Sequence, residues 1–435
     1  MKEKKRDFDK LVLGDGIEYT SDCSVTGCNN NIAVIGGSGS GKSWSVVLKR
    51  IIETKHSNLV VTTAKDRMYD MTSDMMIERG YKVGKLDLAH PEKSTVYWNL
   101  LDSLKSWSAV TQFATDIVYA NKNRKENYSV DPYWNECSIS LFSAMIGYQK
   151  CTKEEPDMKD VLEMFSLLKI LGSDNDGVAE TSLDKTFSEF EKQAGSDHYV
   201  MRMWKTISII PVRTLRCVLG TLSTILDKTF SPDVMGNLIK SEEKEKFDAE
   251  TFSATKSVLY LNTSPYNLNI QYLLNVFYAS LFQNFFEIAE NNGGKLNRDI
   301  AVILDDFAAG GEGGINGFEQ YISTFREAGI SVILLLQSEA QLEKIYGEAA
   351  AISILDNCDT TIYMGTNNRI SAKNVSEKIN RPLEEVLYMP IGKEIVIHRG
   401  EKPKYYVDRY PILEDPVYKK MIRVYEENRI TNVLV

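Results

Sequence analysis

A glycine-rich octapeptide offers the clearest chemistry in this sequence. Residues 36–43 read Gly-Gly-Ser-Gly-Ser-Gly-Lys-Ser and match the pattern Gly-x-x-x-x-Gly-Lys-Ser/Thr of a phosphate-binding loop. Glycines let the backbone curl so that successive N–H groups point at phosphate oxygens, and the following helix adds the positive end of its dipole. The residues predicted to bind a nucleotide are therefore Gly36, Gly37, Ser38, Gly39, Ser40, Gly41, Lys42 and Ser43.

Two residues of this loop have individual roles. We predict that Lys42 reaches the β- and γ-phosphates and that the Ser43 hydroxyl ligates Mg²⁺. A glycine-rich turn without a ligand is the alternative. The apolar strand expected before the loop and the helix expected after it favour the phosphate-binding interpretation, because the mechanism needs both.

A pair of carboxylates supplies the second part of a hydrolytic site. Residues 300–304 form an apolar run that ends in Asp305 and Asp306. Nucleotide hydrolysis needs one acid at a strand end to hold the metal, usually with a second to polarise the attacking water. We assign the first role to Asp305 and the second to Asp306. Ring ATPases usually carry Glu at the second position, and Asp is shorter by about 1 Å, which matters for positioning a reactant.

Two further polar residues flank the next apolar run, at residues 331–336. Gln337 follows the run and could sense the γ-phosphate or hold the attacking water. Arg326 lies on the preceding helical stretch, where it could act as an arginine finger that reaches a neighbouring subunit's nucleotide. A turn residue and a surface salt bridge are the respective alternatives.

The elements that must position these residues follow from the hydrophobic pattern. Short apolar, β-branched runs predict strands, at residues 31–35, 59–63, 82–88, 257–262, 300–304, 331–336 and 360–364. Helical patterns occupy residues 42–54, 69–78 and 270–290. Strand and helix in alternation predict an α/β fold with a mainly parallel sheet and covering helices.

The middle of the chain follows a different pattern. Between residues 101 and 241, apolar residues recur at helical spacing and long β-branched runs are scarce. We predict an all-α domain at 101–241, inserted into a nucleotide-binding domain whose two parts are 1–100, with the phosphate loop, and 242–435, with the acidic motif. Because every candidate for the nucleotide site lies outside the insertion, we expect the insertion to select the substrate.

Composition limits the classes of protein that fit. The chain has 435 residues, a formal net charge of −9 and a charged N-terminus. It has no apolar run of about 18 residues, so we expect a cytoplasmic protein. The negative charge argues against a protein that coats nucleic acid with its whole surface, but it permits a local basic face. Six scattered cysteines without a Cys-x-x-Cys pair indicate free thiols rather than a zinc site.

These motifs together resemble the coupling-protein ATPases of conjugation and type IV secretion, the TraG/TraD family. Most of the chain carries the resemblance, through motifs that follow in the family's order: GGSGSGKS at 36–43, ERGYKV at 78–83, DPYW at 131–134, LDDFA at 304–308, FREAGI at 325–330, LLLQS at 334–338 and NCDT at 357–360. The order of several motifs is harder to obtain by chance than any one of them.

The resemblance implies a RecA-like domain with an inserted all-α domain, the cofactors ATP and Mg²⁺, and a homo-hexameric ring. Such a ring would hand relaxase-bound single-stranded DNA, or protein substrates, to a type IV secretion channel. It also implies nucleotide chemistry for Lys42, Ser43, Asp305, Asp306, Gln337 and Arg326, with the arginine acting across the subunit boundary.

The sequence departs from the family pattern in three places. The usual Asp-Glu pair is Asp305-Asp306, and the usual Asp-Pro-Lys-Gly after the second strand is Thr-Ala-Lys-Asp at 63–66, so that Lys65 alone matches. Many members also begin with transmembrane helices, which this sequence lacks. We therefore expect either that such helices were removed or that a separate membrane partner recruits a protein peripheral to the membrane.

Three functions remain open at this point. The first is an ATP-driven motor for DNA transfer. The second is a nucleotide-dependent docking module that hydrolyses slowly, which the shorter Asp306 would favour. The third is another ring DNA translocase of the HerA/FtsK type, against which the inserted helical domain argues.

Overall fold

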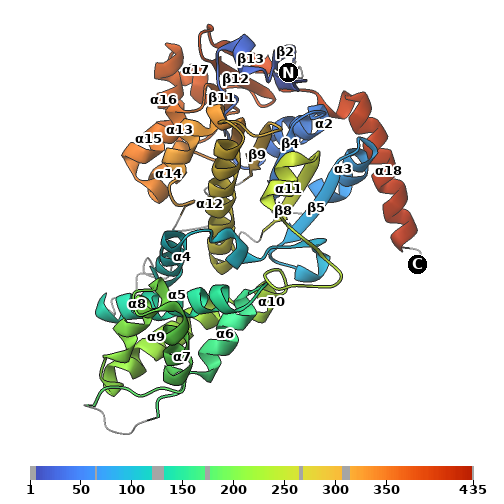
Figure 1. Cartoon of the computed structure of the whole chain (residues 1–435). Helices are drawn as coiled ribbons and strands as arrows, with labels where there is room; N and C mark the ends of the chain where they lie inside the picture. The colour runs from blue at the N-terminus through green and yellow to red at the C-terminus, as the bar shows by residue number, and fades with distance from the viewer. Residues whose placement is uncertain are drawn as a thin grey trace. The chain divides into compact units, whose positions relative to one another are not determined.

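The chain divides into two compact units. In the computed structural model the described residues are 6–63, 66–119, 132–171, 177–263, 268–305 and 314–433. Unit 1 comprises Met1–Leu88, Asp248–Gln271 and Leu281–Val435, and unit 2 comprises Ala89–Phe247 and Tyr272–Ser280 (Figure 1). The sequence predicts boundaries near residues 100 and 241, and it does not indicate that a segment at 272–280 belongs with unit 2.

Unit 1 is built on a sheet that has nine strands among the described residues, in the order β13-β12-β11-β3-β10-β9-β4-β8-β5. The seven strands from β11 to β5 run parallel to their neighbours, and β12 and β13 are antiparallel. The prediction of a mainly parallel sheet is confirmed. The strands are β3 (Ile32–Ile35), β4 (Asn58–Thr63), β5 (Lys82–Asp87), β8 (Ser257–Asn262), β9 (Ile300–Leu304), β10 (Ile330–Leu336), β11 (Thr360–Tyr363), β12 (Lys393–His398) and β13 (Lys404–Asp408).

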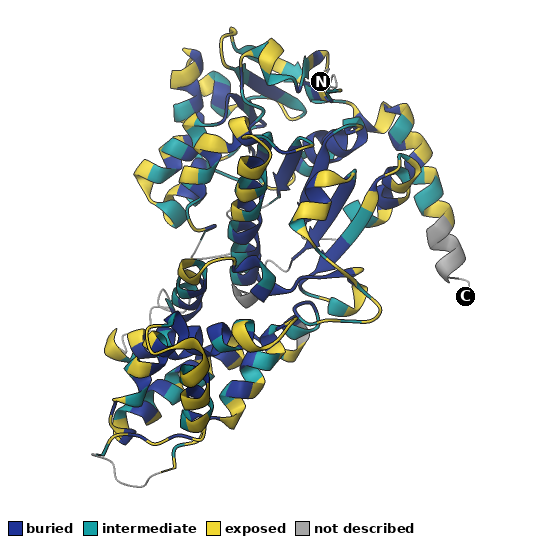
Figure 2. Ribbon diagram, in the orientation of Figure 1, coloured by how far each residue is buried: buried dark blue, intermediate teal, exposed yellow. Residues whose placement is uncertain are grey.

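Helices cover both faces of this sheet. On one face, Val34 and Ile303 belong to a core that includes Val47, Ile51 and Met76 from the helices after β3 and β4. On the other face, Ile35 and Tyr363 pack against α16 and α17. Figure 2 shows the central strands of the sheet as buried. The helices of unit 1 include the π-helical turn η1 (Ser43–Leu48), α2 (Lys49–Glu53), α3 (Arg67–Glu78), α11 (Ala249–Ala254), α13 (Phe318–Ala328), α14 (Glu339–Tyr346), α15 (Glu348–Asp356), α16 (Arg369–Ile379), α17 (Leu383–Leu387) and α18 (Pro416–Val433).

Unit 1 also holds a short hairpin near the N-terminus, which the sequence analysis did not predict. Strands β1 (Lys10–Gly14) and β2 (Ile17–Thr20) form a separate antiparallel pair, and helix α1 (Cys23–Thr26) follows them. The main-chain oxygen of Asp9, at the start of the hairpin, accepts from Ser21 N–H at 2.9 Å. The hairpin therefore closes on itself before the chain enters β3.

Unit 2 is mainly helical, as expected. Its central helix is α5, which packs against α4, α6, α8 and α9. Aromatic side chains fill the interior, and the rings of Phe187 and Trp204 stack with centroids 3.9 Å apart. The helices are α4 (Trp107–Tyr119), α5 (Pro132–Thr152), α6 (Met158–Leu167), α7 (Asp184–Ala194), α8 (Tyr199–Ser208), α9 (Val212–Thr229) and α10 (Pro232–Met235), with a short parallel pair of β6 (Val96–Tyr97) and β7 (Glu245–Lys246).

Helix α12 (Leu268–Asn291) supplies residues to both units. Its middle contributes to unit 2, where the ring of Phe277 meets that of Trp98 edge to face at 5.0 Å. Its second half contributes Phe282 and Phe286 to unit 1, where both pack against Phe325 of α13. Across the described ranges, no helix has the length and apolar character needed to span a membrane.

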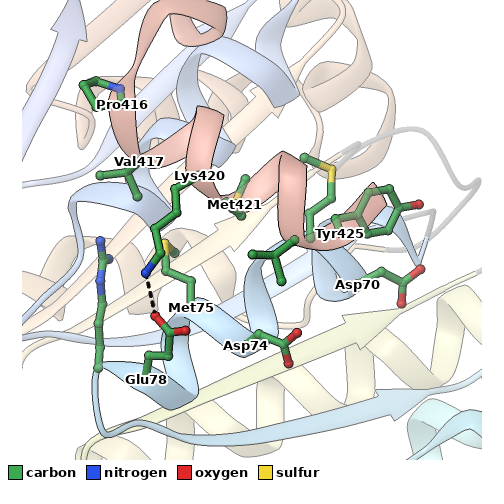
Figure 3. A pocket seen from close by; sticks show the side chains of 12 residues that line it. Asp70, Asp74, Met75, Glu78, Pro416, Val417, Lys420, Met421 and Tyr425 are labelled. Atoms are coloured by element: carbon green, nitrogen blue, oxygen red, sulfur yellow. Dashed lines mark hydrogen bonds and ion pairs between the residues drawn. The ribbon is translucent and has the colours of Figure 1, made fainter. Parts of the chain in front are cut away.

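The C-terminal helix α18 packs on α3 and on the helix that follows β3. The rings of Tyr418 and Trp44 meet edge to face at 6.0 Å, and Met421 is buried in the same cluster. A groove runs between α18 and α3, with an ion pair of 3.2 Å between Lys420 and Glu78 at its rim (Figure 3). The last described helix of the chain is thereby joined to the first helices of the sheet.

Strand β12 carries a buried acid. Glu394 is 1% exposed, and its Oε2 atom has no hydrogen-bond partner among the described residues. Burial raises the pKa of Glu394 to about 8, although the nearby Arg409 guanidinium acts in the opposite direction. The carboxyl group is therefore mostly protonated at neutral pH in the folded protein, whereas in the unfolded chain it ionises near pH 4.5.

Glu394→Gln should change how stability depends on pH. Between pH 4.5 and about 8 the folded protein retains a proton that the unfolded chain has lost. The free energy of unfolding of the wild type therefore falls as pH rises through this window, by up to ~1.4 kcal/mol per unit. The glutamine variant carries no such proton, so its melting temperature relative to wild type should rise steadily from pH 5 to 8.5.

Thermal unfolding of both proteins across this range measures the effect. Glu384→Gln, a change at an exposed residue of α17, is the matched control and should follow the wild-type profile. Parallel profiles for wild type and Glu394→Gln would contradict the prediction.

Candidate nucleotide-binding site

The phosphate loop follows β3 and is bonded to the ends of the two neighbouring strands, β10 and β11. It leaves β3 at Ile35, and Gly36 N–H donates to the carbonyl of Leu336 at the end of β10, at 3.0 Å. Gly37 N–H donates to the carbonyl of Gly365, just after β11, at 2.9 Å. Because β10 and β11 are the two neighbours of β3 in the sheet, main-chain groups on both sides fix the start of the loop.

Glycine is required at several loop positions for different reasons. Gly39 and Gly41 have φ of +73° and +88°, in the region that L side chains rarely adopt. At Gly36 the limit is space, since a Cβ atom there would lie 2.6 Å from Ser40 Oγ and 3.0 Å from Met364 Cβ. The curled backbone that cradles phosphate therefore depends on these residue types.

Lys42 lies inside the curl. Its Nζ donates to the carbonyl of Gly36 at 2.5 Å and to that of Gly37 at 3.2 Å, and the residue is 8% exposed. The helix starts at the next residue, where Trp44 and Ser45 N–H donate to the Gly41 carbonyl at 3.1 and 2.9 Å. The ammonium group and the helix N-terminus thus face the same loop, an arrangement that favours an anion.

The loop serine touches the predicted metal-binding acid. Ser43 Oγ donates to Asp305 Oδ2 at 2.8 Å, although the two residues are 262 positions apart in sequence. Asp305 directly follows β9, which is separated from β3 only by β10. A hydroxyl and a carboxylate oxygen side by side are the hard donors that Mg²⁺ prefers. The structure therefore brings Ser43, the neighbour of Lys42, into contact with Asp305, and this donor set fits the metal.

Gln337 shares the same edge of the sheet. It follows β10, between the strand of the phosphate loop and the strand of Asp305. Its N–H donates to Gln341 Oε1 at 3.0 Å, at the start of α14. Asp306 and Lys65 lie outside the described residues, so the predicted water-polarising role of Asp306 stays a prediction.

Arg326 lies away from this edge. It is exposed in the last turn of α13, just before β10 begins, whereas the site residues follow the strand ends. A strand of seven residues spans about 20 Å, which separates Arg326 from Gln337 along β10. Its Nη2 donates to the carbonyl of Cys23 at 3.4 Å. The structure therefore does not bring Arg326 to the nucleotide site of its own subunit.

The sequence analysis did not identify the groups that hold the loop. Leu336 and Gly365 act through their carbonyl oxygens, and main-chain groups leave no residue-type signal in the sequence. The one available hint was a glycine directly after an expected strand, since Gly365 has φ of +82°.

Comparisons with known proteins find similarity to proteins of type IV secretion. The family model for type IV secretory system conjugative DNA transfer matches residues 4–382. The chain is 24% identical over 175 residues to the type IV secretion system-coupling protein VirD4 of Bartonella henselae, and equally to that of Bartonella quintana. The match covers 40% of this chain and 27% of each relative, so the chain aligns with about a quarter of their length.

Solved structures share the fold at low sequence identity. The plasmid coupling protein TrwB in complex with ADP and Mg²⁺ is similar with a TM-score of 0.64 at 12% identity, over 94% of this chain and 92% of that chain. VirB4 of Thermoanaerobacter pseudethanolicus gives 0.51 at 11% identity, over 95% and 99%. The expected fold, a P-loop domain of the RecA type with an added helical domain, is confirmed.

Gly36→Ala should damage the loop. The added methyl group would meet Ser40 Oγ and Met364 Cβ at distances that force atoms to move. Overpacking of this kind costs about 1–3 kcal/mol. A loss of about 1.4 kcal/mol in binding free energy corresponds to nucleotide binding that is about tenfold weaker.

Titration with a fluorescent ADP analogue, together with melting temperatures, measures the effect of this change. Gly220→Ala in α9, where an added Cβ meets no atom within 4 Å, is the control and should retain wild-type affinity. Unchanged affinity in Gly36→Ala would show that the loop geometry does not determine binding.

Proposed function

This chain belongs to the family of conjugative DNA-transfer proteins of type IV secretory systems, and we propose that it is a coupling-protein ATPase. In this proposal it recruits relaxase-bound single-stranded DNA, or protein substrates, to a secretion channel and drives their transfer by ATP hydrolysis. The observation that carries the proposal is the contact between Ser43 and Asp305 beside Lys42. That contact joins the phosphate loop to the acid after β9, as the proposed hydrolytic site requires.

The proposed chemistry assigns a task to each group. The N–H groups of the loop hold the phosphate chain, and Lys42 neutralises charge that develops on the β- and γ-phosphates. Ser43 and Asp305 would hold Mg²⁺, which supplies further charge neutralisation when bound. Asp306 polarises the attacking water, and Gln337 senses the γ-phosphate from the neighbouring strand end.

We assign Arg326 to the nucleotide of a neighbouring subunit in a homo-hexameric ring. Its exposure, and its place at the opposite edge of the sheet from its own subunit's site, support this role. An arginine supplied by a neighbour stabilises transition-state charge only after assembly. Activity should then depend on ring formation.

Unit 2 is the proposed substrate-selecting part, since none of the groups assigned to nucleotide chemistry belongs to it. A separate membrane partner would hold the protein peripherally at the secretion channel.

A second candidate function is a docking module that binds nucleotide and hydrolyses it slowly. The observation that favours it is Asp306, in place of the longer Glu usual in ring ATPases. Steady-state ATPase assays with and without single-stranded DNA separate the two functions. A motor should accelerate with DNA, whereas a docking module should stay slow.

Lys42→Ala should abolish hydrolysis. The change removes the ammonium group held inside the phosphate loop, and loss of such a charge should lower turnover by about 10²–10³-fold or more. Lys373→Ala, at a residue paired with Glu377 on α16, is the control and should leave turnover unchanged. Turnover close to wild type in folded Lys42→Ala would show that this loop is not the catalytic site.

A mixture of Arg326→Ala and Lys42→Ala should regain activity that neither variant has alone. In random rings, half of the subunits offer an intact Arg326 and half of their neighbours an intact Lys42. If sites act independently, about a quarter of the interfaces hold both groups. Activity of the mixture, measured after co-assembly is verified, should approach that fraction of wild type.

The matched control mixes Lys42→Ala with a double variant that carries both Arg326→Ala and Lys42→Ala. No interface in that mixture has an intact Lys42, so no activity should return. Specific activity of the wild type should also climb with protein concentration as rings form. Absence of rescue in co-assembled rings would confine Arg326 to a structural contact.

A further inference from the structure

A second arginine approaches the phosphate loop from the far end of the sequence. Arg409 directly follows β13, and its Nη1 lies 3.5 Å from the point that a Cβ on Gly41 would occupy. Its Nη2 donates to the carbonyl of Met364 at 3.0 Å and to that of Lys393 at 3.5 Å. Its main-chain N–H donates to Gly392 at 3.1 Å. Several contacts therefore hold this guanidinium beside the loop.

Tyr410 and Asp415, which follow Arg409, contact Lys49 in the helix that follows the phosphate loop. Asp415 accepts from Lys49 Nζ at 2.8 Å and from Tyr410 Oη at 2.9 Å. Lys49, in α2, also lies 3.9 Å from the centre of the Tyr410 ring. The side chains of Lys49 and Asp415 are each 4% exposed. This buried connection fixes the segment that carries Arg409 relative to the phosphate loop.

The guanidinium has unused hydrogen-bonding capacity. Its Nε is buried without a partner, and Nη1 makes no hydrogen bond to any residue that the structure describes. The acid whose charge acts on Arg409 is Glu394, whose pKa burial raises to about 8. Because that acid is mostly neutral at pH 7, it leaves the positive charge of Arg409 largely uncompensated. Such a group matches a phosphate oxygen, to which arginine donates charge-assisted hydrogen bonds.

We propose that Arg409 is a phosphate ligand of the nucleotide bound by its own subunit, with Nη1 as the donor. This inference rests on the proposed function of the loop and adds a residue outside the loop and acidic motifs. Arg409 differs from Arg326, because Arg409 lies beside the loop of the same chain. It also places the C-terminal segment in direct contact with the bound nucleotide.

The test compares Arg409→Gln and Arg409→Ala with wild type. Glutamine keeps an N–H donor for the carbonyls of Met364 and Lys393 but lacks the charge, so it preserves the fold if alanine does not. The probes are a fluorescent ADP analogue and inorganic pyrophosphate as its competitor. Arg381→Ala, whose guanidinium lies over Tyr405 and pairs with Glu385, is the control and should bind as wild type does.

We expect both variants at Arg409 to bind ADP and pyrophosphate about tenfold more weakly, by a similar factor, because a hydrogen bond to a charged group is lost. Arg409→Lys should recover part of the affinity. Wild-type pyrophosphate affinity in folded Arg409→Gln would overturn the proposal, and so would a loss confined to ADP, which would assign the contact to the base or ribose. Absence of nucleotide binding by the wild type would instead overturn the proposed function itself.

Discussion

The alignment of parallel strand ends is the constraint on which the site depends. Strand β10 pairs with β3 and β9 at once, with Ile35 opposite Leu336 and Leu304 opposite Leu334. All three strands therefore finish at one edge, where chemistry collects in open α/β sheets. A slip of one residue would move the ends by about 3.3 Å, which exceeds the 2.8 Å between Ser43 Oγ and Asp305 Oδ2. The register of the three strands therefore decides whether Ser43 and Asp305 can meet.

Much of this arrangement was predictable from the sequence. Strands buried on both faces read as continuous apolar runs. All seven parallel strands were found, although β5 reads Lys-Val-Gly-Lys-Leu-Asp and is only partly buried. Strands β12 and β13 were missed, because β13 is half exposed and β12 carries charged residues at Lys393 and Glu394 among apolar ones. Ser43 and Asp305 were expected to lie close together, since both were assigned to the same Mg²⁺ ion. The division of α12 between two units has no local signal in its continuous helical pattern.

The groups that escaped prediction share a physical cause. Leu336 and Gly365 hold the loop through carbonyl oxygens, which every residue type possesses. Arg409 reaches Gly41 only because the antiparallel strands β12 and β13 carry the chain back past β11. No spacing rule connects positions that lie so far apart in the chain. The buried ion pair between Lys49 and Asp415 also forms only because the chain returns to the phosphate loop after β13. Burial opposes the charge of Lys49, but the hydrogen bonds that Lys49 donates to Asp415 and Glu53 outweigh it and raise the pKa of Lys49.

The insertion of β3 between β10 and β11 also has a consequence for how the protein is made. A ribosome has synthesised the phosphate loop long before it reaches Leu336 and Gly365, the residues that suspend it. Contacts between such distant positions form slowly, because the ordering entropy of the intervening chain must be overcome first. The nascent N-terminal third exposes apolar strands without neighbours in the meantime, a state prone to aggregation. We therefore expect chaperones to bind this chain during translation, and nucleotide to bind only after nearly all of it has emerged.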